Sequence, residues 1–129
     1  MWWVIFSCNE TMATTAAKTI TITLTGDVAG TQTFSPASNT TSAAKIDIVS
    51  LSTGANTITV PSVTGFTVTG VVIAPPAANT NLITIKGVSG DTGVALHKTD
   101  PSYIALDSSV ATFVLNAAAT INGVRLEWS

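Results

Sequence analysis

The stretch INGVRLEW, residues 121–128, carries the pattern that decides the fold of this chain. Val124, Leu126 and Trp128 are apolar and the two residues between them are charged, which places the apolar side chains on one face of an extended strand. Helical periodicity is hard to find anywhere in the sequence. We therefore predict a half-buried β-strand at the end of the chain, with Trp128 in the core.

The same alternation recurs in four other segments, KTITITLTG (18–26), AKIDIVS (44–50), NTITVP (56–61) and NLITIKG (81–87). Each segment predicts a half-buried strand whose aliphatic residues point inward. These inward residues are Ile20, Ile22, Leu24, Ile46, Ile48, Ile58, Val60, Ile83 and Ile85. In the second segment, Lys45 and Asp47 are expected to point outward.

Two further segments, GVVIAPP (70–76) and VATFVLN (110–116), are apolar at successive positions. This pattern predicts burial on both faces, by a facing sheet or by another subunit. Glycine, proline and Asn-Gly turn signals such as Asn122-Gly123 separate the strands at short intervals. The sequence predicts an all-β fold, an antiparallel β-sandwich that is jelly-roll-like. It leaves the strand order open, because a sandwich and a jelly roll share the same alternation.

We expect two parts in the chain, residues 1–13 and a single β-sandwich domain over residues 14–129. The first part begins MWWVIFSC and is either an apolar N-terminal arm or an over-extended start, since Met12 offers a second beginning. As an arm it would pack on a neighbouring subunit. The residues that we predict at a protein interface are Trp2, Trp3, Ile5, Phe6, Val71, Val72 and Ile73, the last three with the core as the alternative.

Composition limits the function classes. The chain has 129 residues, of which 46% are hydrophobic and only 9% charged, with a formal net charge of -2. Five scattered basic residues offer no stripe for a phosphate backbone, so we expect no nucleic-acid partner. The opening apolar run is too short to span a bilayer, so we expect no membrane partner either. A single cysteine, Cys8, excludes an internal disulfide and a multi-cysteine metal site.

Three constellations suggest chemistry and are set aside. Asp91-Thr92-Gly93 is the tripeptide of aspartic proteases, but a glycine-rich turn precedes it where an apolar strand is required. His97, near Asp100, Tyr103 and Asp107, has no marked nucleophile. Calcium held by the aspartates of this region lacks any EF-hand-like spacing. We therefore expect no catalytic residue, no cofactor and no metal site, and hence no enzyme.

From about Thr14 to Ser129 the chain resembles small all-β virion proteins of tailed bacteriophages, including capsid cement or decoration proteins. The resemblance lies in the Thr-, Ala- and Asn-rich strands of residues 70–129, which begin GVVIAPPAANTNLITIKG and end INGVRLEWS. It implies a jelly roll or similar sandwich, often trimeric, that binds the major capsid protein. It also implies a location on the exterior of the phage head after synthesis in the bacterial cytoplasm.

No functional residue of that family can be transferred, because no motif is matched position by position. The alternative reading is a tail or fibre β-module that binds a host surface glycan, for which Trp2, Trp3 and Tyr103 are the candidate aromatic platforms. A third reading, a hydrolase that uses Asp91, is remote.

Overall fold

The structure is a computed structural model that describes residues 14–16, 20–24, 30–34, 39–41, 45–62 and 67–129, the first four segments by their backbone alone. All regular structure in these residues is β-strand, and none of it is helix. The described part of the chain accordingly contains no helix long and apolar enough to cross a membrane.

The first four strands pair only with one another. They are β1 (Thr14–Ala16), β2 (Ile20–Leu24), β3 (Gly30–Phe34) and β4 (Asn39–Thr41). β1 pairs with β4 and β2 pairs with β3, both antiparallel. The position of β2 confirms the strand that was predicted in KTITITLTG.

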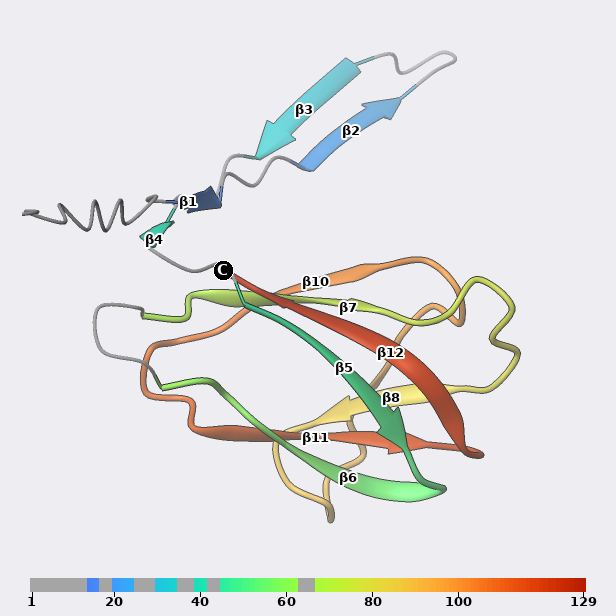
Figure 1. Cartoon of the computed structure of the whole chain (residues 1–129). Helices are drawn as coiled ribbons and strands as arrows, with labels where there is room; N and C mark the ends of the chain where they lie inside the picture. The colour runs from blue at the N-terminus through green and yellow to red at the C-terminus, as the bar shows by residue number, and fades with distance from the viewer. Residues whose placement is uncertain (1–13, 17–19, 25–29, 35–38, 42–44, 63–66) are drawn as a thin grey trace, which may run out of the picture.

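The remaining eight strands form two antiparallel four-stranded sheets (Figure 1). The β5 sheet has the order β10-β7-β12-β5 and the β6 sheet has the order β6-β11-β8-β9. Their strands are β5 (Lys45–Leu51), β6 (Gly54–Thr59), β7 (Gly70–Ala74), β8 (Ile83–Lys86), β9 (Val94–Ala95), β10 (Ser102–Ala105), β11 (Thr112–Ala117) and β12 (Ile121–Trp128).

The pairing of these eight strands follows a nested order. The first strand, β5, pairs with the last, β12, and the second, β6, pairs with the seventh, β11. Likewise β7 pairs with β10, and β8 pairs with β9. The eight strands therefore form one long folded-back ribbon whose two halves lie antiparallel. The pairs β12–β7 and β11–β8 join neighbouring parts of this ribbon within each sheet.

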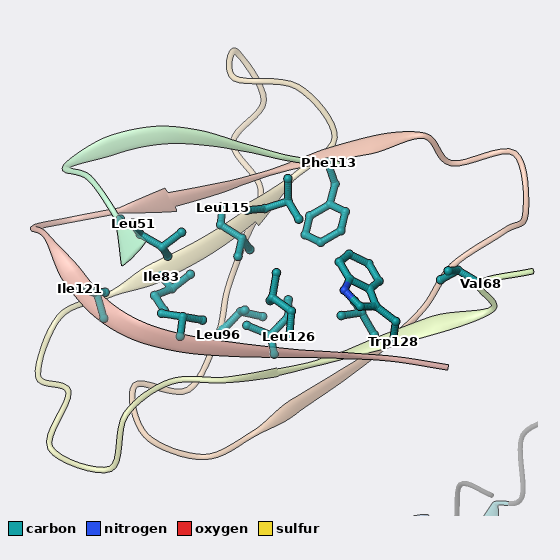
Figure 2. Close-up of a cluster of buried hydrophobic side chains, with 14 residues drawn as sticks. Leu51, Val68, Ile83, Leu96, Phe113, Leu115, Ile121, Leu126 and Trp128 are labelled. Atoms are coloured by element: carbon teal, nitrogen blue, oxygen red, sulfur yellow. The ribbon is translucent and has the colours of Figure 1, made fainter. Parts of the chain in front are cut away.

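The core lies between the two sheets (Figure 2). Its largest fully buried side chains come from both layers, and they are Leu51, Val71, Ile73, Ile83, Leu115, Val124 and Leu126. At one end the rings of Phe113 and Trp128 pack at a tilt of 59°, with their centroids 6.2 Å apart. Such aromatic and aliphatic packing across facing sheets supplies most of the stabilisation of a fold of this kind.

Most of the predicted inward positions whose side chains the structure describes are confirmed; the side chains of Ile20, Ile22 and Leu24 lie outside this part. Val124, Leu126 and Trp128 of β12 are all buried, as are Ile58 of β6 and Ile83 of β8. Period-two alternation was a reliable guide in these strands because each has one face on the core and one face outside it.

The prediction for β5 was wrong, because the strand is turned over. Ile46 and Ile48 point outward and are 56% and 75% exposed, whereas Val49 packs against the core and Leu51 is buried. Asp47 shares the inward face, where its Oδ2 accepts a hydrogen bond of 2.8 Å from Nε1 of Trp128. A buried indole N–H needs an acceptor, and Asp47 provides one in this orientation.

The Asn122-Gly123 pair, predicted as a turn, lies inside β12. The register of β12 against β5 shifts between Ile121 and Val124, which is a β-bulge, and Gly123 has a φ of +81°. Glycine adopts this left-handed conformation without steric cost. The bulge lets Ile121 and Val124 both point inward although they are three residues apart.

Asn56 fixes the corner where the chain leaves the β5 sheet for the β6 sheet. Its Oδ1 accepts a hydrogen bond from the backbone N–H of Ser52 at 2.9 Å. Its Nδ2 donates to the carbonyl oxygens of Ser52, Gly54 and Leu115. One amide side chain thus ties the β5–β6 turn to β11 in the centre of the β6 sheet.

Candidate interaction surface

The Asp-Thr-Gly tripeptide forms a local turn in the loop between β8 and β9. The Oδ2 atom of Asp91 accepts a hydrogen bond from the N–H of Val88 at 2.9 Å, and the N–H of Asp91 donates to the carbonyl of Val88. Gly93 has a φ of +74°, and a Cβ there would overlap the carbonyl oxygen of Ile85. Asp91 and Gly93 are therefore used to shape the turn.

His97 also serves a turn. Its Nδ1 accepts the backbone N–H of Asp100 at 3.0 Å, and the Asp100 carboxylate lies 3.3 Å from the same nitrogen. The Thr99 hydroxyl approaches that nitrogen too, at 3.5 Å. A catalytic triad requires the nucleophile and the carboxylate on opposite nitrogens of the ring, so this cluster does not have the geometry of one.

Asp107 closes a third local turn, with Ser109. Its Oδ1 accepts hydrogen bonds from the hydroxyl and the backbone N–H of Ser109, at 2.6 and 2.9 Å. The hydroxyl first, and then the N–H, lower the pKa of this exposed carboxyl from its usual value, because both stabilise the ionised form. Across the described residues, no three His, Cys, Asp or Glu side chains gather as a metal site would require.

The predicted interface residues fall into three groups. Trp2, Trp3, Ile5 and Phe6 lie outside the described residues. Val71 and Ile73 are 0% exposed and belong to the core, which was the alternative for them. Val72 points to the other side of β7, where it is half-buried.

Val72 belongs to the outer face of the β5 sheet, which has an unusual composition. The strand register places Tyr103, Val72, Glu127 and Ile46 in one row across all four strands. The neighbouring row contains Ala74, Arg125 and Ile48. Arg125 and Glu127 form an ion pair between these rows on the central strand β12.

Tyr103 extends this face over β7. A Cβ atom on Gly70 would lie 2.7 Å from Cε2 of Tyr103, so the ring occupies the space above the glycine. A glycine within a strand that lies beneath an aromatic ring is a known sheet device. The outer face therefore has Val72 and the Tyr103 ring at one end, on β7 and β10, and exposed isoleucines at the opposite end on β5.

Among the residues that the structure describes, none pairs with one side of the β5 backbone, because β5 is an edge strand. The backbone N–H and C=O groups of Ser129 form hydrogen bonds with those of Gly70. Because these groups alternate in direction along an antiparallel strand, the backbone groups of Glu127 and Arg125 also point toward β7. The residues between them, Leu126 and Trp128, must bond to their β5 partners Asp47 and Lys45.

It follows that the intervening residues of β5 turn their backbone N–H and C=O groups toward the free edge. These residues are Ile46, Ile48 and Ser50. We call this row of groups the β5 edge. The same residues carry the outward side chains of the strand, so unpaired backbone and exposed apolar surface coincide.

The other edges of the two sheets differ. β9 has only two residues, and β10 has four and follows Pro101. β6 exposes Ala55, Thr57 and Thr59, which are small or hydroxyl-bearing. Among the described strands of the two sheets, β5 combines the longest edge with the largest exposed apolar side chains.

Three surface depressions among the described residues provide no comparable site. One of 610 Å³ is lined by residues that include Lys86, Asp91, Val94 and Phe113. Two others, of 450 and 500 Å³, are lined by small, polar and aliphatic residues and by His97. Phe113 is the one Phe, Tyr or Trp residue in the three linings, and it is buried. A groove with exposed aromatic rings, as the glycan alternative predicts, is not among these three depressions.

Sequence reasoning missed the outer face because it assigned Ile46 and Ile48 to the core. A signal for the correct assignment was present: Leu51 lies an even number of residues from Val49 and Asp47 and an odd number from Ile48. Extending the strand by one residue favours the inward face that the structure adopts. No protein-family description, curated protein sequence or solved structure matches this chain.

Proposed function

We propose that this protein is a non-enzymatic structural protein of a bacteriophage virion. In its most specific form, the proposal is that the protein is a capsid cement or decoration subunit that binds the major capsid protein on the exterior of the head. In this role it self-associates as a trimer and acts through buried surface and β-edge contacts. The phage assignment rests on the sequence resemblance described above.

The strand order supports the jelly-roll part of the proposal. In a jelly roll a long antiparallel ribbon is rolled into two four-stranded sheets, so that first pairs with last and second with seventh. The eight strands from β5 to β12 have this nested pairing, and their sheet orders alternate between the two halves of the ribbon.

The observation that carries the proposal is the exposed outer end of the β5 sheet. Ile46 and Ile48 stand on an unpaired strand edge in a chain whose described loops hold His97, Asp91 and Asp107 in local turns. Apolar side chains beside free backbone groups suit binding to another protein by strand addition and surface burial. They do not suit bond-breaking chemistry, which needs a nucleophile or an acid–base pair.

A binding assay on phage particles tests the proposal. Fluorescently labelled full-length protein is mixed with heads and, separately, with tails of the phage that encodes the chain. The proposal predicts saturable binding to heads, and a trimer mass by light scattering for chains starting at Met1 and at Met12. Binding to tails or to a glycan array, with no binding to heads, would establish the tail-module alternative instead.

A further inference from the structure

The β5 edge has the properties of a self-complementary contact. Three of its features are established above: seven residues that no described strand pairs with on one side, outward Ile46 and Ile48, and backbone groups of the same residues that face this open side. An edge of this kind can be extended by another strand, which completes the hydrogen bonds and covers the apolar side chains.

We propose that a second copy of this chain occupies the β5 edge, with the two β5 strands antiparallel about a two-fold axis. The two β5 sheets then join into one continuous eight-stranded sheet. A two-fold axis presents the same patch on both subunits, so the contact needs only one surface. It is additional to any three-fold contact, because it joins two copies whether each is single or part of a trimer.

Charge selects the register of the pair. A register that centres on Asp47 sets that carboxylate directly opposite its own copy, which is unfavourable. A register that centres on Ile48 sets Asp47 opposite Val49, where the carboxylate keeps its hydrogen bond to Trp128.

The register centred on Ile48 also pairs the whole strand. Lys45 lies opposite Leu51 and Ile46 opposite Ser50, so all seven residues of β5 find partners. Centring on Val49 pairs only residues 47–51 within the strand. Ile48 then meets its own copy across the axis in the favoured register, a β-branched pair of the kind that stabilises antiparallel strands.

The backbone directions agree with this arrangement. The backbone groups of Ile46, Ile48 and Ser50 face the free edge. In the register centred on Ile48 these residues pair only with one another, so every new hydrogen-bonded pair joins two edge-facing residues. One strand pair buries less surface than a stable dimer needs, which makes the contact concentration-dependent.

Disulfide trapping tests the contact in full-length protein in which Cys8 is replaced by Ser. In the Ile48→Cys variant the two introduced thiols face each other with Cα atoms about 5.5 Å apart, within the range of about 4.4–6.8 Å that a disulfide requires. We expect a covalent dimer under mild oxidation. In the matched Ser50→Cys variant the two sulfurs are four residues out of register, about 13 Å apart, and we expect no cross-link.

Solution mass provides the second readout. The average mass by light scattering should rise with concentration above its dilute value, and Ile48→Lys should hold it at the dilute value by placing two charges together on the axis. Val88→Lys, at an exposed apolar position in the β8–β9 loop, should keep the rise.

Equal cross-linking of the Ile48→Cys and Ser50→Cys variants, or a mass that Ile48→Lys leaves unchanged, would overturn the proposal. If the first 44 residues of the same chain cover the β5 edge, neither variant will form a cross-link. That result would also overturn the proposal. Head binding is a separate measurement, so failure of this contact and failure of the proposed function can be told apart.

Discussion

Strands β5 and β6 follow each other in the chain and are both edge strands, yet they expose different kinds of side chain to solvent. β6 buries Ile58 and exposes alanine and threonine, whereas β5 buries Leu51, half-buries Val49 and exposes two isoleucines. A turn held by Asn56 connects them. The difference teaches that alternation alone identifies a strand but does not always identify its inner face, because β5 has aliphatic residues on both faces.

The largest expected effect comes from replacing one isoleucine on each strand. Ile58→Ala should lower the free energy of unfolding by about 2–4 kcal/mol, because it removes buried methyl groups and leaves a cavity. Ile48→Ala should change it by less than about 0.5 kcal/mol, because the side chain is exposed in a single copy. Urea denaturation in dilute solution measures both, and equal losses would mean that Ile48 faces the core.

The next effect concerns the turn between the two strands. Asn56→Ala should cost about 1–3 kcal/mol, because it leaves the Ser52 N–H and the Leu115 carbonyl without their side-chain partner. Asn56→Asp keeps the acceptor for the Ser52 N–H but loses the Nδ2 donors, so it should lower the free energy of unfolding by a smaller amount than Asn56→Ala. Thermal unfolding followed by circular dichroism ranks the two variants, and an unchanged midpoint for Asn56→Ala would argue against this role.

How far the sequence determined the fold can be judged at particular residues. Trp128 and Val124 were placed correctly because a charged residue separates each apolar pair on β12. The β5 face was not, because the hydrogen bond between Trp128 and Asp47 joins residues 81 positions apart. The one local signal, the even spacing of Leu51 from Asp47, lies one residue beyond the segment 44–50 in which the alternation was read. The nested strand order was equally out of reach, because it depends on long-range pairing that alternation does not encode.

A smaller effect tests what holds β5 in its orientation. Asp47→Ala should cost about 1–2 kcal/mol, because the Trp128 indole N–H loses its acceptor. Asp47→Asn retains an oxygen at that position and should be closer to the wild-type protein. Urea denaturation provides the comparison, and two identical losses would show that the charge, or its pairing with Lys45, matters more than the acceptor.

The smallest effect is expected in the turn between β10 and β11, outside both strands, and serves as a reference. Ser109→Ala should raise the pKa of Asp107 toward its ordinary value, since the hydroxyl that lowers it is gone. Because the folded-state pKa is the lower one, the Ser109 contact stabilises the fold above the unfolded-state pKa and ceases to do so as the pH falls through the folded-state value. Carboxyl chemical shifts followed by NMR across the acid range report this directly, and an unshifted titration would contradict the assigned cause.

Amide hydrogen exchange along β5, measured by NMR at two protein concentrations, tests the central claim most directly. The N–H groups of Asp47 and Val49 bond to β12 and should be protected at both concentrations. Those of Ile46 and Ile48 face the free edge and should exchange rapidly in dilute protein but become protected when the concentration is raised. Protection of Ile48 in dilute protein, or its rapid exchange at every concentration, would contradict the account of β5 as an open edge that a second copy completes.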